Sequence, residues 1–123
     1  MWTYKQSTGQ MFHFGNEVGV GYSGNTTGLN NPEAQSERMV GPAPQGFYAI
    51  GKPENHPKLG PLAMPLVPHS SNVMFGRSGF FIHGDNSAMN HTASDGCLIF
   101  SHAVRLFISQ LVVNGDDSLV ITE

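Results

Sequence analysis

The sequence predicts a mostly β domain with one short helix. Only 12% of its 123 residues are charged, about half the usual share of roughly 25% in soluble domains. The 15 glycines and 8 prolines indicate many tight turns. Short β-rich runs recur along the chain, whereas only one stretch has a helical period. Because a chain of this length buries a single core, we expect one domain over residues 1–123, folded as a twisted sheet or sandwich.

The N-terminal half is predicted to contain strands and loops. Alternating residues over 2–6 and 11–14, about a turn that contains Gly, indicate a hairpin. Residues 19–45 are rich in Gly, Asn, Ser and Pro, so we expect an ordered loop or surface lobe there. A β-rich run predicts a strand at 46–50. Five prolines between residues 52 and 68 favour an extended, edge-like or irregular path.

The C-terminal half is predicted to hold two further strands, the helix and a closing strand. Residues 72–75 and 80–83 have the composition of strands, and the second is expected to be central and buried. Apolar residues at 104, 107, 108 and 111 have the spacing of one helical face, and Ser101 is a suitable N-cap. The helix is therefore expected near residues 101–112. A turn then leads into a strand at 118–122.

Charge and hydropathy exclude several classes of function. The net charge is −3 and the six Lys and Arg residues are scattered, so we expect no nucleic-acid partner. No apolar run approaches the roughly 18 residues that span a bilayer, and the first residues lack the apolar core of a secretory signal. We expect a soluble chain without an export signal. Its single cysteine excludes an internal disulfide.

Reactive side chains are concentrated between His83 and Cys97. A strand rich in aromatic residues ends at His83, a polar loop returns to the turn that holds Cys97, and a β-like run follows at residues 98–100. A cysteine nucleophile needs a nearby imidazole, which His83 or His91 can supply. Gly96 allows the N–H groups of residues 95–97 to converge on an oxyanion. We treat the other four histidines, His13, His56, His69 and His102, as structural or solvated.

Two motifs in this order resemble a known family. Ile82-His83-Gly84 followed by Ser94-Asp95-Gly96-Cys97-Leu98 is similar to the signature of the L,D-transpeptidases (YkuD-like). The segment Gly41–Ile50 looks like the Thr-Pro-x-Gly-x-Tyr-x-Ile strand of that family. The family's His before Gly-Cys is Asp95 here, and its Arg after the Cys-Ile pair is Phe100. The resemblance implies an L,D-transpeptidase-like fold and no cofactor.

The resemblance is greatest to a compact bacterial branch and extends over nearly the whole chain. That branch includes type VI secretion effectors that attack peptidoglycan, which would explain a cell-wall enzyme without a signal peptide. It implies synthesis in the cytoplasm, delivery to the periplasm of a target bacterium and a cognate immunity protein. The matching residues are Trp2, Tyr4, Ser7–Gly9, Tyr22–Gly24, Asn31-Pro32 and Gly41–Tyr48.

The family's chemistry implies that Cys97 is the nucleophile and His83 its base. The thiolate would attack the L,D bond before the terminal D-Ala of a peptidoglycan tetrapeptide stem. The N–H groups of Gly96 and Cys97 would stabilise the oxyanion, and water or a D-amino acid would resolve the thioester. The carbonyl of Gly84 would orient the base.

Other residues near this pair have open roles. Asp85 orients the imidazole or caps the loop, and His91 is an alternative base in a polar loop. Ser94 caps the turn or contacts substrate, and Asp95 is expected to point away from the thiol, because its carboxylate would raise the thiol pKa. Arg77 or Arg105 would replace the missing family Arg as a clamp for the substrate carboxylate, since a guanidinium pairs bidentately with such groups.

The sequence leaves two alternatives. In the first, His83, Asp85 and His91, with or without Cys97, bind the zinc ion of a peptidase, although the spacing matches no zinc motif. A wall-binding module with an inert Cys97 would leave the clustering of His83, Ser94, Gly96 and Cys97 unexplained.

Overall fold

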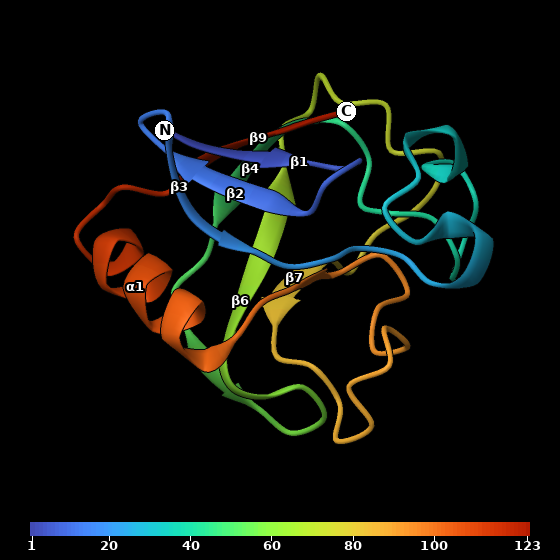
Figure 1. Ribbon diagram of the computed structural model, residues 1–123. Helices are drawn as coiled ribbons and strands as arrows, with labels where there is room; N and C mark the ends of the chain where they lie inside the picture. The colour runs from blue at the N-terminus through green and yellow to red at the C-terminus, as the bar shows by residue number, and fades with distance from the viewer.

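The computed structural model describes all residues 1–123 and contains one curled, nine-stranded sheet with one α-helix (Figure 1). The strand order is β3-β2-β1-β9-β4-β6-β7-β8, and β5 pairs with β6. This confirms the predicted mostly β fold of the L,D-transpeptidase type. The elements are β1 (Trp2–Lys5), β2 (Gln10–His13), β3 (Asn16–Val20), η1 (Thr26–Gly28), η2 (Pro32–Ala34), β4 (Gly46–Ile50), β5 (Glu54–His56), β6 (Gly60–Pro68), β7 (Phe81–His83), β8 (Leu98–Ile99), α1 (His102–Val113) and β9 (Ser118–Thr122).

The two ends of the chain meet in the middle of the sheet. β1 pairs in parallel with β9, with Trp2 opposite Leu119, and β9 in turn pairs with β4. The predicted hairpin is present as β1 and β2, which are antiparallel. β3, which continues this meander, lies partly in the segment that was expected to begin the loop. Its exposed and half-buried residues carry no clear alternation, so the sequence did not indicate it.

Elements with strong local signals agree with the sequence. β4 and β9 are confirmed, and so is α1, which begins after Ser101. β7 is present and largely buried, but it is next to the edge strand β8 and not central. The Ser101 hydroxyl accepts a hydrogen bond from the Val104 N–H at 3.3 Å, as an N-cap does. α1 packs against β6 and closes one side of the sheet (Figure 1).

Two predictions about the middle of the chain need correction. The Pro-rich segment is extended, as expected, but it forms β6, the longest strand, which lies inside the sheet and is neither edge-like nor irregular. β6 changes partner along its length, pairing with β5, β7 and β4 over short stretches, so its prolines do not interrupt one continuous ladder. Residues 72–75 form no strand: Asn72 bonds through its side chain to the backbone of Phe47, and Phe75 has a φ of +57°.

The core lies between α1 and the concave sheet and reaches the start of the reactive loop. Ile82 of β7 and Leu98 of β8 are fully buried and pair directly, so the two strands that flank the reactive loop are anchored in the core. Neither α1 nor the two short 3₁₀ turns has the length and apolar character of a membrane-spanning helix. The largest fully buried side chains are Trp2, Tyr4, Phe100, Met11, Ile50, Met64, Ile82, Leu98, Ile108, Leu119, Ile121 and Gln6.

Candidate active site

Two parallel strands bring Cys97 and His83 into one cleft. In the β7–β8 ladder Ile82 lies opposite Leu98, so Cys97, the residue before β8, lies beside the start of β7. The Phe81 N–H donates to the Cys97 Sγ at 3.3 Å. Cys97 and His83 both line a cleft with a volume of about 580 Å³. The sheet thus joins the two residues that the sequence separates by a polar loop.

His83 is held in the tautomer that a base requires. Its Nδ1 lies 2.8 Å from the carbonyl oxygen of Gly84, and because a carbonyl only accepts, Nδ1 carries the proton. Nε2 therefore keeps its lone pair. The side chain is buried, and this burial lowers the pKa of His83 from its usual value of 6.5. The hydrogen bond with Gly84 opposes this lowering of the pKa, and the charge of Arg105 adds to it. His83 is a neutral acceptor at neutral pH.

Cys97 rests as a thiol. Burial raises the pKa of the Cys97 thiol above its usual value, while the hydrogen bond from Phe81 lowers it and the charge of Asp95 raises it. Asp95 is exposed and also lines the cleft. A thiol and a neutral imidazole that line one cleft are suited to proton transfer during attack, as with a serine nucleophile and its histidine.

Ser94 holds the turn that presents Cys97. Its hydroxyl is fully buried and makes three hydrogen bonds to the backbone. It donates to the Cys97 carbonyl at 2.6 Å and accepts from the N–H groups of Gly24 at 2.9 Å and Gly96 at 3.0 Å. All of its hydrogen-bonding capacity is used within the protein, which agrees with the predicted cap of the turn and leaves nothing for substrate.

A lobe at residues 21–45 clamps the same turn. The Ser23 hydroxyl donates to the Gly96 carbonyl at 2.8 Å, and the Asn25 side chain donates to the Ser94 carbonyl at 2.7 Å. The sequence did not indicate that Ser23 and Asn25 contact the Cys97 turn. The one pattern that points to this segment is the Tyr-Ser-Gly motif at 22–24, which is part of the family resemblance.

The two predicted oxyanion donors differ in availability. The Gly96 N–H already donates to Ser94, whereas the Cys97 N–H has no partner within the chain. Gly96 has a φ of +135°, and a Cβ there would lie 2.5 Å from the Phe80 ring and 2.6 Å from the Arg77 guanidinium. Glycine is therefore required at position 96 for both backbone conformation and space.

Asp85 and His91 lie apart from the cleft. The Asp85 carboxylate accepts from the Tyr22 hydroxyl at 2.7 Å and the Asn86 N–H at 2.9 Å, and makes no hydrogen bond to His83. The His91 ring packs edge-on against Tyr22 at 4.8 Å. Both residues line a separate hollow that contains neither Cys97 nor His83. Asp85 thus bonds within its own loop, and its charge acts on His83 only by raising the pKa of the imidazole.

Both arginines predicted as carboxylate clamps bind the protein's own backbone. The Arg77 guanidinium lines the cleft but donates four hydrogen bonds, of 2.6–3.0 Å, to the carbonyls of Gln35, Gly41, Pro42 and Asp95. Arg105 lies outside the cleft and donates to the carbonyls of Phe100 and Pro61 at 3.0 and 2.6 Å. These guanidinium groups hold segments of the fold together.

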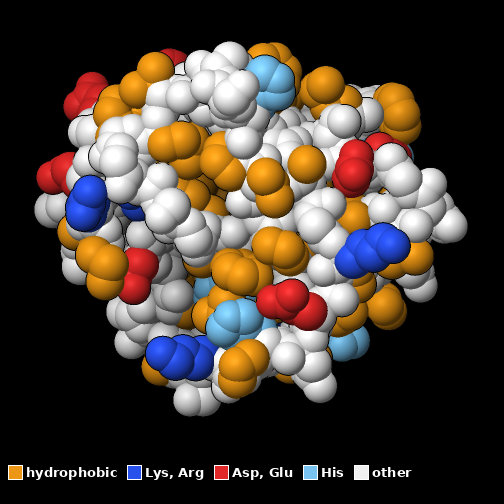
Figure 2. Space-filling view, turned by 180° about the vertical axis from the view of Figure 1, so that it is seen from behind, with side chains coloured by type: hydrophobic (Ala, Val, Ile, Leu, Met, Phe, Trp, Pro, Cys, Tyr) orange, Lys and Arg blue, Asp and Glu red, His pale blue; other side chains and the backbone are white.

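Three basic residues that the sequence did not assign to the site also line the cleft, among them His56, which we had treated as structural or solvated. Arg38 comes from the lobe, while His56 and Lys58 come from the end of β5 and the turn after it. No periodicity or motif linked them to Cys97, because their proximity depends on the pairing of β5 with β6 and of β6 with β7. Elsewhere the basic side chains are dispersed, and Figure 2 shows them singly over one face.

No zinc site forms from the predicted ligands. His83 faces the cleft, whereas Asp85 and His91 line the separate hollow. Nowhere in the chain do three or more His, Cys, Asp or Glu side chains come together in a position to hold a metal ion. The zinc alternative therefore lacks a ligand set.

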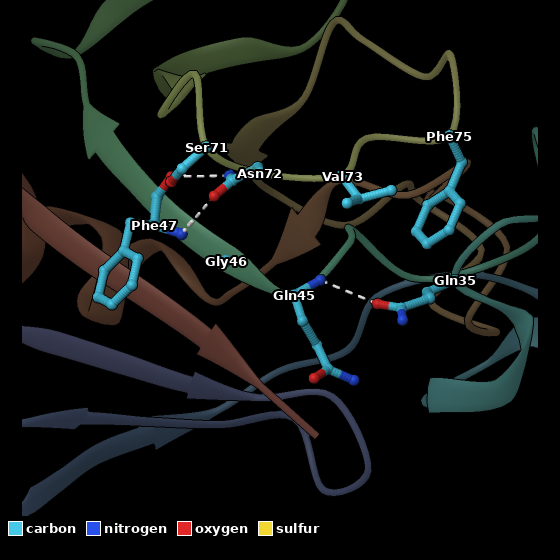
Figure 3. Close-up of a pocket in the computed structure, with 8 residues that line it drawn as sticks. All are labelled: Gln35, Gln45, Gly46, Phe47, Ser71, Asn72, Val73 and Phe75. Carbon is cyan, nitrogen blue, oxygen red and sulfur yellow. Dashed lines mark hydrogen bonds between the residues drawn. The ribbon is translucent and has the colours of Figure 1, made fainter.

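A further hollow of about 340 Å³ lies at the junction of β4 with the lobe (Figure 3). The Asn72 side chain makes two hydrogen bonds to the Phe47 backbone there, and a Cβ on Gly46 would overlap it. The Gln35 side chain accepts from the Gln45 N–H at 2.9 Å. These hydrogen bonds hold the segments around β4 together. No titratable side chain lines the hollow.

The curled sheet and its cleft are those of the L,D-transpeptidase-like fold. The chain belongs to the Tlde1 domain family, a type VI effector family related to L,D-transpeptidases, whose model matches residues 17–122. No curated protein matches the chain.

Among solved structures, the chain is similar to the helical cell shape determining protein Pgp2 from Campylobacter jejuni, with a TM-score of 0.63 and 17% identity. The K307A mutant of Pgp2 gives a TM-score of 0.61 at the same identity. In both cases the match covers 99% of this chain and 46% of the other. The chain thus spans about half the length of Pgp2, and at this identity the likeness concerns the fold alone.

Proposed function

We propose that residues 1–123 act as one catalytic domain, a cysteine-dependent L,D-carboxypeptidase or L,D-transpeptidase. Its substrate is the tetrapeptide stem of peptidoglycan, cleaved before the terminal D-Ala. The observation that carries this proposal is the pairing of Cys97 with His83 in one cleft, with the His83 Nδ1 bound to the Gly84 carbonyl and Nε2 left as a base. Membership of the Tlde1 domain family supports a peptidoglycan substrate.

Acylation begins with proton transfer from the Cys97 thiol to Nε2 of His83. The sulfur attacks the carbonyl carbon of the L,D bond, and the Cys97 N–H donates to the resulting oxyanion. The Gly96 N–H contributes if it turns from Ser94. The tetrahedral intermediate collapses with rupture of the C–N bond. His83 returns the proton to the departing amine, so D-Ala leaves and a thioester remains on Cys97.

Deacylation uses the same base. His83 accepts a proton from water or from the amine of a D-amino acid, which attacks the thioester carbonyl. The C–S bond breaks, the proton returns to the sulfur, and the free thiol is regenerated. Water gives carboxypeptidase activity, whereas an amine gives exchange.

We further propose that the protein acts as an antibacterial effector in the periplasm of a target cell, as its family suggests. A producing cell then needs a cognate immunity protein that occludes the Cys97 cleft. Failure to find any neutralising partner in the source cell would count against this part of the proposal while leaving the chemistry intact.

The test is incubation of the purified protein with defined muropeptides, with and without D-methionine, and analysis of the products by mass spectrometry. We expect loss of terminal D-Ala, or its exchange for D-methionine, in wild type only and not in Cys97→Ala or His83→Ala. The exposed His102→Ala protein serves as the matched histidine control. No product in any sample would favour the wall-binding module.

A further inference from the structure

The rim of the Cys97 cleft contains a histidine with a defined tautomer. Nδ1 of His56 accepts hydrogen bonds from the N–H groups of Lys58 at 3.0 Å and Leu59 at 3.1 Å. Because both partners are donors, Nδ1 carries no proton in this arrangement, and the ring proton is on Nε2. The ring also packs edge-on against Phe81 at 5.2 Å, which limits its rotation.

The Nε2–H of His56 has no partner in the protein. The Tyr4 hydroxyl is the only buried side-chain polar atom without a hydrogen bond, so the unpartnered Nε2 of His56 must be accessible to solvent. The donor therefore faces space that a ligand or water can enter, and the residue lines the cleft with Cys97 and His83. A fixed neutral donor of this kind suits an oxygen acceptor.

Two unpaired cations lie in the same cleft. Lys58 is exposed and makes no ion pair, because the only salt bridge of the structure joins His13 to Asp116 elsewhere. One N–H of the Arg38 guanidinium donates to the Gly76 carbonyl at 3.0 Å, and the other N–H groups have no hydrogen-bond partner. Asp95 is the one acidic residue lining the cleft. Lys58, Arg38 and the occupied Arg77 thus outnumber it, so the cleft favours an anionic ligand.

We propose that His56 and Lys58, assisted by Arg38, form the binding site for the C-terminal carboxylate of the peptide that Cys97 attacks. The site restricts the enzyme to peptides that end close to the scissile bond. This inference rests on the proposed function, since it names the substrate feature that the cleft recognises. It moves the carboxylate role from Arg77 and Arg105, whose guanidinium groups are used by backbone carbonyls, to groups that are free to bind substrate.

The test measures binding in the Cys97→Ala background, so it does not depend on turnover. Calorimetry compares a tetrapeptide stem that has a free terminal carboxylate with the same peptide as its terminal amide. We expect the free acid to bind about tenfold or more tightly, as loss of a charge-assisted hydrogen bond implies. Lys58→Met should remove most of this preference, because the uncharged amide gains little from the ammonium group. His56→Asn should weaken the binding of both peptides, and that of the free acid more, since a carboxylate accepts a stronger hydrogen bond than an amide carbonyl.

The variants are chosen so that folding failure does not obscure the result. Asn keeps an acceptor near the position of Nδ1, and its shorter side chain holds its own N–H groups closer to the backbone, away from the position of Nε2. Lys58 is exposed, so its substitution leaves packing intact. Lys52→Met, a lysine outside the cleft, is the matched control and should keep the preference. Equal acid-to-amide ratios in the parent and in Lys58→Met would overturn the proposal. Selective acid binding with no turnover by wild type would refute the proposed function alone.

Discussion

Substitution of Ser94 by alanine tests how the nucleophile is positioned. The Ser94 hydroxyl satisfies three buried backbone groups: the N–H groups of Gly24 and Gly96 and the carbonyl of Cys97. Each unsatisfied buried group costs about 1–3 kcal/mol. Even at the lower limit, Ser94→Ala should lower the free energy of unfolding by about 3 kcal/mol. The thermal midpoint should fall by roughly 10 °C.

The assay is urea unfolding followed by circular dichroism, together with kcat/KM on a muropeptide below the unfolding transition. Activity should fall as well, because the turn that presents Cys97 loses its internal bonds. Ser36→Ala is the matched control, since Ser36 lies exposed in the lobe and makes no side-chain hydrogen bond. A loss below about 1 kcal/mol in Ser94→Ala would refute the reasoning, because it would mean that these three groups are satisfied in some other way.

Three further predictions concern the base, the turn and the helix. Because burial lowers the pKa of His83, the acid limb of kcat/KM against pH should lie below pH 6.5, with activity lost as pH falls; a limb above pH 7 would contradict the assignment. Gly96→Ala should be destabilised far more than Gly15→Ala in thermal unfolding, since only the first new Cβ meets other atoms; equal losses would contradict the packing. Arg105→Met should lower stability by about 2 kcal/mol, because two carbonyls lose their donor. The folded fraction should retain near-normal kcat/KM at neutral pH, and a large loss there would place Arg105 in the reaction.

The sequence was most informative where the signals are local. Strand β4 and helix α1 follow from the composition and period of their own residues, and Ser101 marks the helix start. The place of β6 inside the sheet was not predicted. Prolines are expected to interrupt a continuous ladder of hydrogen bonds, but β6 pairs with different strands over short stretches. His83 and Cys97 were identified from their motifs, and the pairing of β7 with β8 is what brings them together.

The surroundings of the site were less predictable because they depend on distant segments. Arg77 has the right chemistry and lies in the right cleft, but carbonyls from the lobe occupy its guanidinium. The hydroxyl of Ser23 reaches Gly96 across more than seventy residues, and no local pattern encodes such a contact. His56 reaches the cleft only through the pairing of β5 with β6.

The most direct test of the central claim is to detect the thioester on Cys97. Wild-type protein is mixed with a tetrapeptide stem, quenched in acid within the first turnovers, and analysed by intact-protein mass spectrometry and peptide mapping. We expect a mass increase equal to the tripeptide acyl group on the peptide that contains Cys97, absent in Cys97→Ala and removed by hydroxylamine. Release of D-Ala by Cys97→Ala at the wild-type rate, with no adduct in either protein, would contradict it.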